Sequence, residues 1–203
     1  ITGGKRILDI GTGTGLVAIM VAQRCDAKIV AIEPEEKSYL EACENVKACQ
    51  WKEKISVVNT GLRGFFPGNE EQFDIIITNP PYFRDSLKNP DEGKSGARHS
   101  DSLTSSDILE GTDKLLTSSG SLQLILPYTE GTLFIAEASS YGFYCNRIIK
   151  IKPVPTGEII RLILKFERIK KPVHEKFLTI ETGIRHSYTE EYMEILKDFY
   201  LRF

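Results

Sequence analysis

The stretch KRILDIGTGTG, residues 5–15, decides the fold that this sequence predicts. Its first part, residues 5–10, is a short apolar run of the kind that forms a buried strand. The run enters a loop in which Gly11, Gly13 and Gly15 alternate with threonine, and a helical pattern follows to residue 25. A strand that turns through glycines into a helix predicts the first unit of a parallel α/β sheet.

The same alternation of strand and helix patterns continues along the chain. Strands are predicted at 28–33, 54–59, 73–78 and 120–127, with helices at 14–25, 35–49, 103–116 and 129–142, the last ending at a glycine cap, Gly142. This order predicts a parallel sheet with helices on both faces. Two further strands, 143–152 and 158–168, are separated only by a proline-rich turn. We therefore expect them to pair antiparallel, as a hairpin at or near one edge.

Composition limits the classes of function. The 203 residues are 41% hydrophobic and 27% charged, which predicts one domain spanning residues 1–203. The formal charge of −2 provides no general basic field, so a nucleic-acid partner would need a local patch. No apolar run approaches the roughly 20 residues that span a bilayer. A polar stretch without periodicity, residues 84–102, predicts a functional or disordered loop.

The cysteines and histidines do not have the spacing of metal ligands. None of the four cysteines forms a C-x-x-C pair, and the three histidines are scattered. We therefore expect no metal site, and reduced thiols packed as small hydrophobic groups in a cytoplasmic protein.

The glycine loop predicts a nucleotide-type ligand. Its glycines allow positive φ or close backbone approach, and the following helix start offers free N–H groups. A dinucleotide site would require glycine at position 16, where this chain has Leu16. The carboxylate of Asp9 would repel a diphosphate, but it would suit the ammonium group of an amino-acid tail. The pattern favours S-adenosylmethionine over NAD, and the alternative is a glycine turn that binds no ligand.

The second predicted strand adds an acid to this site. It ends at Glu33, followed by Pro34, and an acid in this position can accept hydrogen bonds from both hydroxyls of a ribose. The alternative is a strand end that carries an acid without a ligand. The residues predicted to bind the cofactor from these two turns are Asp9, Gly11, Thr12, Gly13, Gly15, Glu33 and Pro34.

A second motif, TNPPYF at residues 78–83, ends the fourth predicted strand. Each residue before a proline is restricted to extended backbone, so Asn79 and Pro80 are stiffened, and Pro81 braces the turn. Proline has no N–H, which leaves the Asn79 side-chain oxygen and the Pro80 carbonyl as two fixed acceptors. Tyr82 offers a flat face to a ring, worth about 1–3 kcal/mol for a stacked base, and Phe83 a second. The alternative is an ordinary Pro-Pro loop.

Two fixed acceptors match the two hydrogens of a planar amino group. The lone pair of such a nitrogen is delocalised into its ring, and holding both hydrogens favours a pyramidal nitrogen that can attack a methyl sulfonium. Positioning and fixed dipoles then carry the reaction without a strong base. Asn79, Pro80, Pro81 and Tyr82 are the predicted catalytic residues, and Asn79 also faces the cofactor.

These motifs resemble those of class I S-adenosylmethionine-dependent methyltransferases of the N6-adenine type. DIGTGTG (9–15) is similar to their cofactor loop, Glu33 to their ribose acid and NPPYF (79–83) to their catalytic motif. QWKEKI (50–55), ARH (97–99) and YTEEYMEILKDFYL (188–201) resemble the bacterial enzymes that methylate N6 of adenine 37 in valine tRNA. The resemblance extends over nearly the whole chain.

The resemblance implies a Rossmann-like α/β fold with a seven-stranded sheet, order 3-2-1-4-5-7-6 and strand 7 antiparallel. It also implies S-adenosylmethionine as cofactor, a tRNA substrate, and an adenine flipped into the pocket. Members usually carry a segment before the first strand, and the given sequence begins almost on that strand, so we expect part of the cofactor or substrate lid to be absent. They also place an Asp near the end of strand 3, where this chain has Gly61. We expect backbone groups of Gly61 or Leu62 to contact the cofactor's adenine instead.

Basic residues gather late in the chain and could contact RNA phosphates. They are Lys150, Lys152, Arg161, Lys165, Arg168, Lys170 and Lys171, with Arg98 and His99 in the polar loop. The predicted substrate-binding residues are Lys152, Arg161, Arg98 and His99, together with Tyr82 and Phe83. The alternative is a solvated charged face.

Three other functions use similar motifs. A glutamine N5-methyltransferase that acts on release factors carries an N-terminal helical substrate domain, and a DNA adenine methyltransferase usually adds a target-recognition domain. We expect neither domain here. A non-catalytic cofactor-binding scaffold would not need Asn79 or Tyr82, and both are present. No obligate protein partner is indicated.

Overall fold

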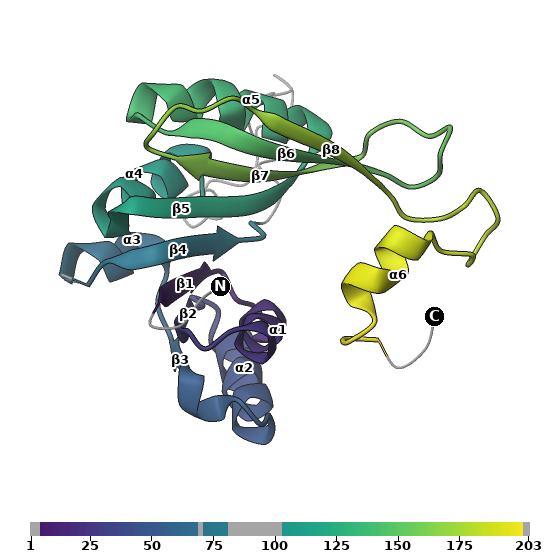
Figure 1. Ribbon diagram of the computed structural model, residues 1–203. Coiled ribbons are helices and arrows are strands. Elements are labelled where there is room, and N and C mark those ends of the chain that lie inside the picture. Colours follow the sequence, from purple (N-terminus) through teal and green to yellow (C-terminus); the bar gives the residue numbers. More distant parts are fainter. Residues whose placement is uncertain (1–4, 69–70, 81–102, 201–203) are drawn as a thin grey trace, which may run out of the picture.

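One mixed β-sheet forms the centre of the computed structural model, which describes residues 5–68, 71–80 and 103–200 (Figure 1). Its strands are β1 Arg6–Ile10, β2 Lys28–Ile32, β3 Ile55–Val58, β4 Phe73–Thr78, β5 Leu116–Pro127, β6 Tyr144–Lys152, β7 Arg161–Glu167 and β8 His174–Thr179. They lie in the order β3-β2-β1-β4-β5-β7-β6-β8. The predicted order of seven strands is confirmed, and β8 adds an eighth strand that the sequence analysis did not include.

Strand direction fixes which residues share an edge of the sheet. Strands β1 to β5 are parallel, β7 is antiparallel to both β5 and β6, and β8 is parallel to β6. The carboxyl ends of all strands except β7 therefore lie together, with the start of β7 beside them. We call this side the carboxyl edge, and the opposite side, where β7 ends at Glu167, the amino edge.

Helices cover the two faces unequally. Helices α3 Leu62–Phe65, α4 Ser105–Leu115 and α5 Tyr128–Ala138 pack on one face over the larger core, where Phe134 and Phe166 meet edge to face at 5.4 Å. Helices α1 Leu16–Arg24 and α2 Glu36–Ala48 cover the other face through a smaller core that includes Ala18, Val46 and Ile75. The sheet is therefore wound on both sides, as predicted.

Short 3-10 turns complete the helical elements. They are η1 Lys52–Lys54, η2 Phe66–Gly68 and η3 Ser139–Tyr141. Gly142 follows η3 with φ 75°, and the Phe143 N–H donates to the Ala138 carbonyl at 3.0 Å. This closes the end of α5 as the predicted glycine cap does. Over the described parts of the chain, no helix is long and apolar enough to cross a membrane.

The junction of α4 and β5 differs from the prediction, which starts the strand at Gly120. The strand begins at Leu116, directly after the helix, and its register with β4 shifts between the Phe73–Leu116 and Ile75–Ser121 pairs. A Cβ on Gly120 would lie 2.7 Å from the Leu116 side chain. The glycine thus lies inside the strand and permits a close approach at its irregular start.

The C-terminal arm, residues 174–200, contains β8 and the helix α6 Glu190–Leu196. Figure 1 shows α6 beyond the end of β8, the strand that precedes it in the chain and that it contacts. The arm returns to α1, where Arg24 pairs with Asp198 at 3.0 Å and Gln23 donates to the Asp198 carbonyl at 3.1 Å. The C-terminal arm therefore contacts the sheet through β8, which pairs with β6, and the helix layer through α1.

Candidate active site

The glycine loop crosses the end of β2. Gly11, Gly13 and Gly15 have φ values of 68°, 58° and 81°, which favour glycine. The Ile32 carbonyl accepts hydrogen bonds from the N–H groups of Gly11 and Thr12, at 2.9 and 3.0 Å. A Cβ on Gly11 or Gly13 would meet nothing within 4 Å, whereas one on Gly15 would contact Ala42 at 3.4 Å. Gly15 lets α1 and α2 approach, and the other two leave open space beside the loop.

Asp9 lies buried at the end of β1, below this loop. Its carboxylate accepts a hydrogen bond from the Thr12 hydroxyl at 2.6 Å. Burial raises the pKa of Asp9 to about 6, because removal from water disfavours the charged form; the Thr12 bond opposes this and the charge of Glu33 adds to it. An ammonium group placed beside Asp9 would favour the ionised form, so the site suits a cationic ligand group.

Glu33 lies buried at the end of β2, and backbone groups hold its carboxylate in place. The Gly13 N–H donates to one oxygen at 2.9 Å and the Glu35 N–H to the other at 3.0 Å. The Asn59 amide donates to the Glu33 carbonyl at 2.9 Å and fixes the turn into α2. A carboxylate oxygen can accept more than one hydrogen bond, so both oxygens retain capacity for ribose hydroxyls. Pro34, exposed, follows.

Gly61 and Leu62 lie next to this turn, at the end of β3. A Cβ on Gly61 would be 3.6 Å from Pro34, so the two turns are neighbours. The Leu62 side chain is buried in the larger core, where a Cβ on Gly111 would approach it to 2.8 Å. Leu62 can therefore offer a ligand only its backbone, which agrees with the expected backbone contact.

The end of β4 is bonded to the end of β1. Thr78 is buried, and its hydroxyl donates to the Ile10 carbonyl at 2.9 Å. Asn79 is exposed and Pro80 is buried. Asn79, the first predicted acceptor, follows Thr78, and the glycine loop follows Ile10. The bond between Thr78 and Ile10 therefore brings the two motifs together. Pro81, Tyr82, Phe83, Arg98 and His99, with the rest of the loop 84–102, lie outside the described residues.

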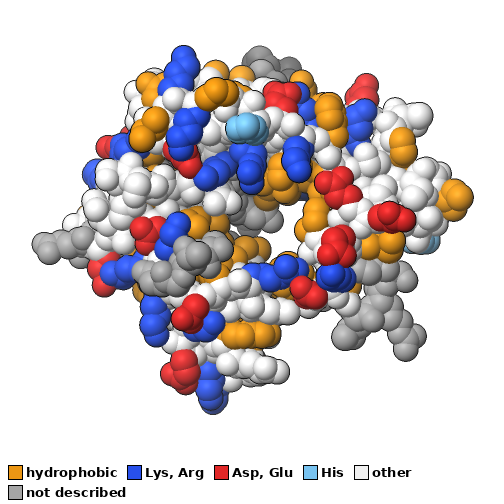
Figure 2. All heavy atoms as spheres, in the orientation of Figure 1, with side chains coloured by type: hydrophobic (Ala, Val, Ile, Leu, Met, Phe, Trp, Pro, Cys, Tyr) orange, Lys and Arg blue, Asp and Glu red, His pale blue; other side chains and the backbone are white. Residues whose placement is uncertain are grey.

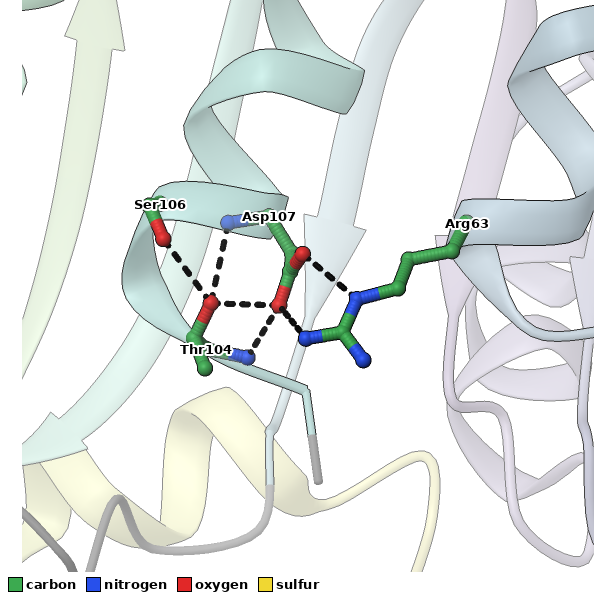
Figure 3. Close-up of polar contacts among 4 residues, drawn as sticks. All are labelled: Arg63, Thr104, Ser106 and Asp107. Atoms are coloured by element: carbon green, nitrogen blue, oxygen red, sulfur yellow. Dashed lines mark hydrogen bonds and ion pairs between the residues drawn. The ribbon is translucent and has the colours of Figure 1, made fainter. Parts of the chain in front are cut away.

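The chain after the polar loop is anchored at the start of α4 (Figure 3). Thr104 and Asp107 form a capping box, in which the Asp107 N–H donates to the Thr104 hydroxyl at 3.2 Å and the Thr104 N–H to the Asp107 carboxylate at 2.8 Å. Arg63 from α3 donates twice to Asp107, at 2.6 and 2.7 Å. Burial would raise the pKa of Asp107, but the bonds from Arg63 and Thr104 outweigh it, so the pKa lies below its ordinary value.

The predicted basic cluster is divided between the two edges of the sheet. Lys152 and Arg161 lie at the carboxyl edge, on the same side of the sheet as the glycine loop and Asn79. Arg168 lies past the amino edge and pairs with Asp113 at 2.8 Å. Lys165 and Lys171 pair with Glu167 there, at 2.7 and 2.5 Å. Strand register separates these residues, and sequence order alone could not show it.

Two positioning residues, Thr78 and Asn59, had no role in the sequence analysis. A polar residue that ends the apolar run FDIIIT is a signal for Thr78, whereas Asn59 has no distinctive signal. All four cysteines are free thiols. Among the described residues, no group of three or more His, Cys, Asp or Glu is arranged to hold a metal ion.

Comparison with known proteins defines the class. A family model described as "Methyltransferase small domain" matches residues 2–132. Among solved structures, a predicted O-methyltransferase from Agrobacterium tumefaciens superposes with a TM-score of 0.70 at 19% identity, covering 95% of this chain and 88% of that one. TrmN from Thermus thermophilus gives a TM-score of 0.60 at 22% identity, covering 83% and 45%. The fold is the Rossmann-like methyltransferase fold.

Curated relatives narrow this class. A protein of Bacteroides thetaiotaomicron is 40% identical over 99% of this chain and 84% of its own length. One from Trichodesmium erythraeum is 34% identical over 100% and 86%. Both are named tRNA1(Val) (adenine(37)-N6)-methyltransferase. This chain therefore belongs to the methyltransferase small domain family.

Proposed function

We propose that this protein transfers a methyl group from S-adenosylmethionine to N6 of an adenine in tRNA, namely A37 of valine tRNA. The observation that carries the proposal is the bond between Thr78 and Ile10, 2.9 Å, which fixes Asn79 beside the glycine loop. The residues proposed to accept the amino hydrogens and those proposed to bind a cationic cofactor therefore lie at one edge of one sheet. The names of the curated relatives support the same reaction.

The residues of the glycine loop and of the β2 and β3 ends fit the cofactor. Asp9 would bind the ammonium end, Glu33 the ribose hydroxyls, and the backbone at Gly61 and Leu62 the adenine. The open space beside Gly11 and Gly13 leaves room for a ligand against the backbone. When bound, S-adenosylmethionine supplies an electrophilic methyl group on a sulfonium.

Asn79 and Pro80 would orient the nitrogen that accepts the methyl group. The Asn79 side-chain oxygen and the Pro80 carbonyl accept the two hydrogens of the adenine amino group, which directs the nitrogen lone pair toward the cofactor. Fixed dipoles of this kind act in the transition state without reorganising. The proton that the methylated nitrogen loses passes to these acceptors or to solvent. Tyr82, with Phe83, would stack on the flipped base.

Lys152 and Arg161 would contact phosphates of the bound tRNA near the adenine. Both lie at the carboxyl edge, as the motif does. Arg98 and His99 would add contacts from the polar loop. Each phosphate that a cation neutralises should add about 0.7 to 0.9 to the steepness of the salt dependence of binding.

The test is methyl transfer from labelled S-adenosylmethionine to total tRNA from cells that lack the enzyme, followed by nucleoside analysis. N6-methyladenosine should form at A37 of valine tRNA with the wild-type protein. Its formation should be about 100- to 1000-fold slower with Asn79→Ala, a variant that must still bind the cofactor. Label that entered glutamine of a release factor would replace this proposal with the protein N5-methyltransferase function.

A non-catalytic role makes a different prediction. A cofactor-binding scaffold would bind S-adenosylmethionine and transfer no methyl group to RNA or protein, with or without Asn79. Activity with the purified wild-type chain therefore excludes it.

A further inference from the structure

One face of the sheet is covered by α1 and α2 over only part of its width, and α6 contacts β8 at the far end of the strand order. On that face α1 and α2 pack against the half built by β1 to β4, through the smaller core. Helices α4 and α5 pack on the opposite face, against Leu124, Leu164 and Leu162. We call the side of β5, β7, β6 and β8 that faces as α1 does the open face. Figure 1 shows these strands at one end of the sheet, with α1 and α2 at the other end.

Strand register assigns the residues of the open face, because paired residues share a face and neighbours along a strand alternate. Leu124, Leu164 and Ile148 are paired and face the larger core. The rows on either side of them therefore point outward. These rows contain Gln123, Lys165, Arg147 and His174, then Ile125, Ile163, Ile149 and Lys176. A further row on this side contains Arg161 together with Ile151 and Leu178, which are buried.

The charged residues of these rows are basic. Arg147, Arg161, Lys165 and Lys176 provide the cations, and Figure 2 shows Lys, Arg and His side chains gathered over the region of β6, β7 and β8. Two acids lie on these strands near the cations. Glu175 points to the other face and pairs with Lys150, and Glu167, at the amino edge, pairs with Lys165. Since the whole chain has a net charge of −2, this concentration of positive charge is local.

Two of these cations, unlike those at the amino edge, form no ion pair with a described residue. Arg147 and Lys176 are exposed, and no ion pair joins either of them to another described residue. By contrast, Arg168 pairs with Asp113 and Lys171 with Glu167. Between the basic rows, the isoleucines at 125, 149 and 163 are only partly exposed. Long basic side chains can cover apolar surface while their charged ends stay in water, so the open face presents charge rather than an apolar groove.

We propose that the open face binds the phosphate backbone of the tRNA body, apart from the nucleotide held at Asn79; this inference rests on the proposed function. Charge complementarity favours a polyanion as the occupant, because unpaired cations gain most from phosphates and release their counterions. Contacts of this kind position a nucleic acid without reading its sequence.

Strand order brings the open face near the candidate active site. Arg161 pairs with Pro127 at the end of β5, and β5 is the direct neighbour of β4, which ends at Thr78. With about 4.8 Å between adjacent strands, β7 lies about 10 Å across the sheet from β4. One RNA molecule can therefore contact the open face while one of its nucleotides occupies the site at Asn79.

The test compares two double charge reversals that change the net charge equally. The test variant is Arg147→Glu with Lys176→Glu, on the open face. The control is Lys47→Glu with Lys52→Glu, two exposed cations at the end of α2 and in η1. Dissociation constants for the valine tRNA transcript are measured from 50 to 200 mM salt. The test variant should weaken binding about tenfold or more at low salt and reduce the salt slope by about 1.5, for two lost contacts. The control should stay within about twofold of wild type.

Cofactor binding and kinetics separate the outcomes. The test variant should bind S-adenosylmethionine as wild type does, and its KM for tRNA should rise while kcat stays the same. Unchanged tRNA binding, or an equal loss in the control, overturns the open face as the RNA contact. A dimer that the test variant dissociates would assign the face to a second copy of the chain and also overturns it. If the wild-type protein binds tRNA through this face but transfers no methyl group, the proposed function fails and the open face stands.

Discussion

The pKa values of two carboxyl groups, one at each edge of the sheet, are shifted in opposite directions. At the carboxyl edge, the pKa of Asp9 is raised to about 6. At the amino edge, the pKa of Glu167 is lowered to about 2. The pKa of Asp9 is raised because the carboxyl group is buried away from water and lies near the charge of Glu33. The hydrogen bond from the Thr12 hydroxyl offsets only part of this shift. Glu167 is bonded by Lys165, Lys171 and the Asn146 amide.

The difference separates a structural site from a binding site. At the amino edge, Glu167 pairs with two lysines of the same chain, so its negative charge stabilises the fold. The acid at the carboxyl edge is held in an environment that opposes its charge, and a cationic ligand would relieve this. Perturbed carboxyl groups of the second kind are a feature of functional sites. We therefore expect substitutions at the carboxyl edge to change activity and ligand binding, and substitutions at the amino edge to change stability alone.

Asn79→Ala should have the largest effect and should leave stability unchanged. The side chain is exposed, so its removal leaves no cavity, whereas loss of a fixed acceptor should lower the rate of methyl transfer by about 100- to 1000-fold. Initial rates with tRNA and thermal unfolding measure the two effects. Gln50→Ala, an exposed amide after α2, should change neither. A loss of rate matched by a loss of stability would contradict the division between the edges.

Asp9→Asn should weaken cofactor binding and stabilise the free protein. At pH 7.5 the buried carboxyl is ionised at a cost, and a shift of two pKa units corresponds to about 3 kcal/mol, of which we expect about 1–2 kcal/mol to be recovered. The dissociation constant for S-adenosylmethionine should rise about tenfold or more. Calorimetry measures the dissociation constant, and urea unfolding measures the change in the free energy of unfolding.

The effect of Asp9 on the stability of the folded protein should depend on pH. Because the pKa of Asp9 in the folded protein lies above its value of 3.8 in the unfolded chain, its contribution to stability is fully present below about pH 4. It is lost as the pH rises through about 6. The stability advantage of Asp9→Asn should therefore vanish near pH 4. An advantage that stayed constant from pH 4 to pH 8 would show that ionisation of Asp9 is not its cause.

Local patterns in the sequence predicted the parts of the site that depend on neighbours in the chain. The glycine loop, Glu33 and the start of NPPYF occupy strand ends because apolar runs and glycines mark those ends directly. Element β8 was not predicted, since its residues 174–177 are exposed and it forms a strand by pairing with β6. Helix α6 has seven residues and depends on contacts with α1 and β8.

The grouping of the basic residues could not be predicted from order in the chain. Arg161 and Lys165 are four residues apart, which in a strand is about 13 Å and brings them toward different edges. Register also assigns Arg147 to the open face, and the sequence analysis did not single out that residue. The capping box of Thr104 and Asp107 did have a sequence signal, a Thr followed three residues later by an acid, which was not used.

Glu167→Gln should cost stability without affecting the site. Lys165 and Lys171 lose their ionised partner, so we expect a loss of about 1 kcal/mol at pH 7. The pKa of Glu167 is lowered from 4.5, so its contribution is present above about pH 4.5 and is lost as the pH falls toward about 2. Urea unfolding at pH 7 and pH 3 should show a smaller difference between variant and wild type at pH 3. If Glu167→Gln changed the affinity for S-adenosylmethionine, Glu167 would affect the binding site, and its role would not be confined to stability.

Thr78→Val should have a small effect on both stability and rate, and it tests whether Thr78 positions Asn79. It removes the bond from the Thr78 hydroxyl to the Ile10 carbonyl at nearly constant volume, which should cost about 0.5–1.5 kcal/mol. The matched control is Thr112→Val in α4, because the Thr112 hydroxyl is buried without a hydrogen-bond partner among the described residues. That change should be neutral or stabilising, since it removes an unpaired polar group. If Thr78 positions Asn79, then Thr78→Val should also lower kcat several-fold with little change in the KM for S-adenosylmethionine, because small displacements of a positioned acceptor reduce the rate of the chemical step. Equal kcat values in the two valine variants would confine Thr78 to a structural role, and Asn79 would then owe its place to the β1–β4 pairing alone.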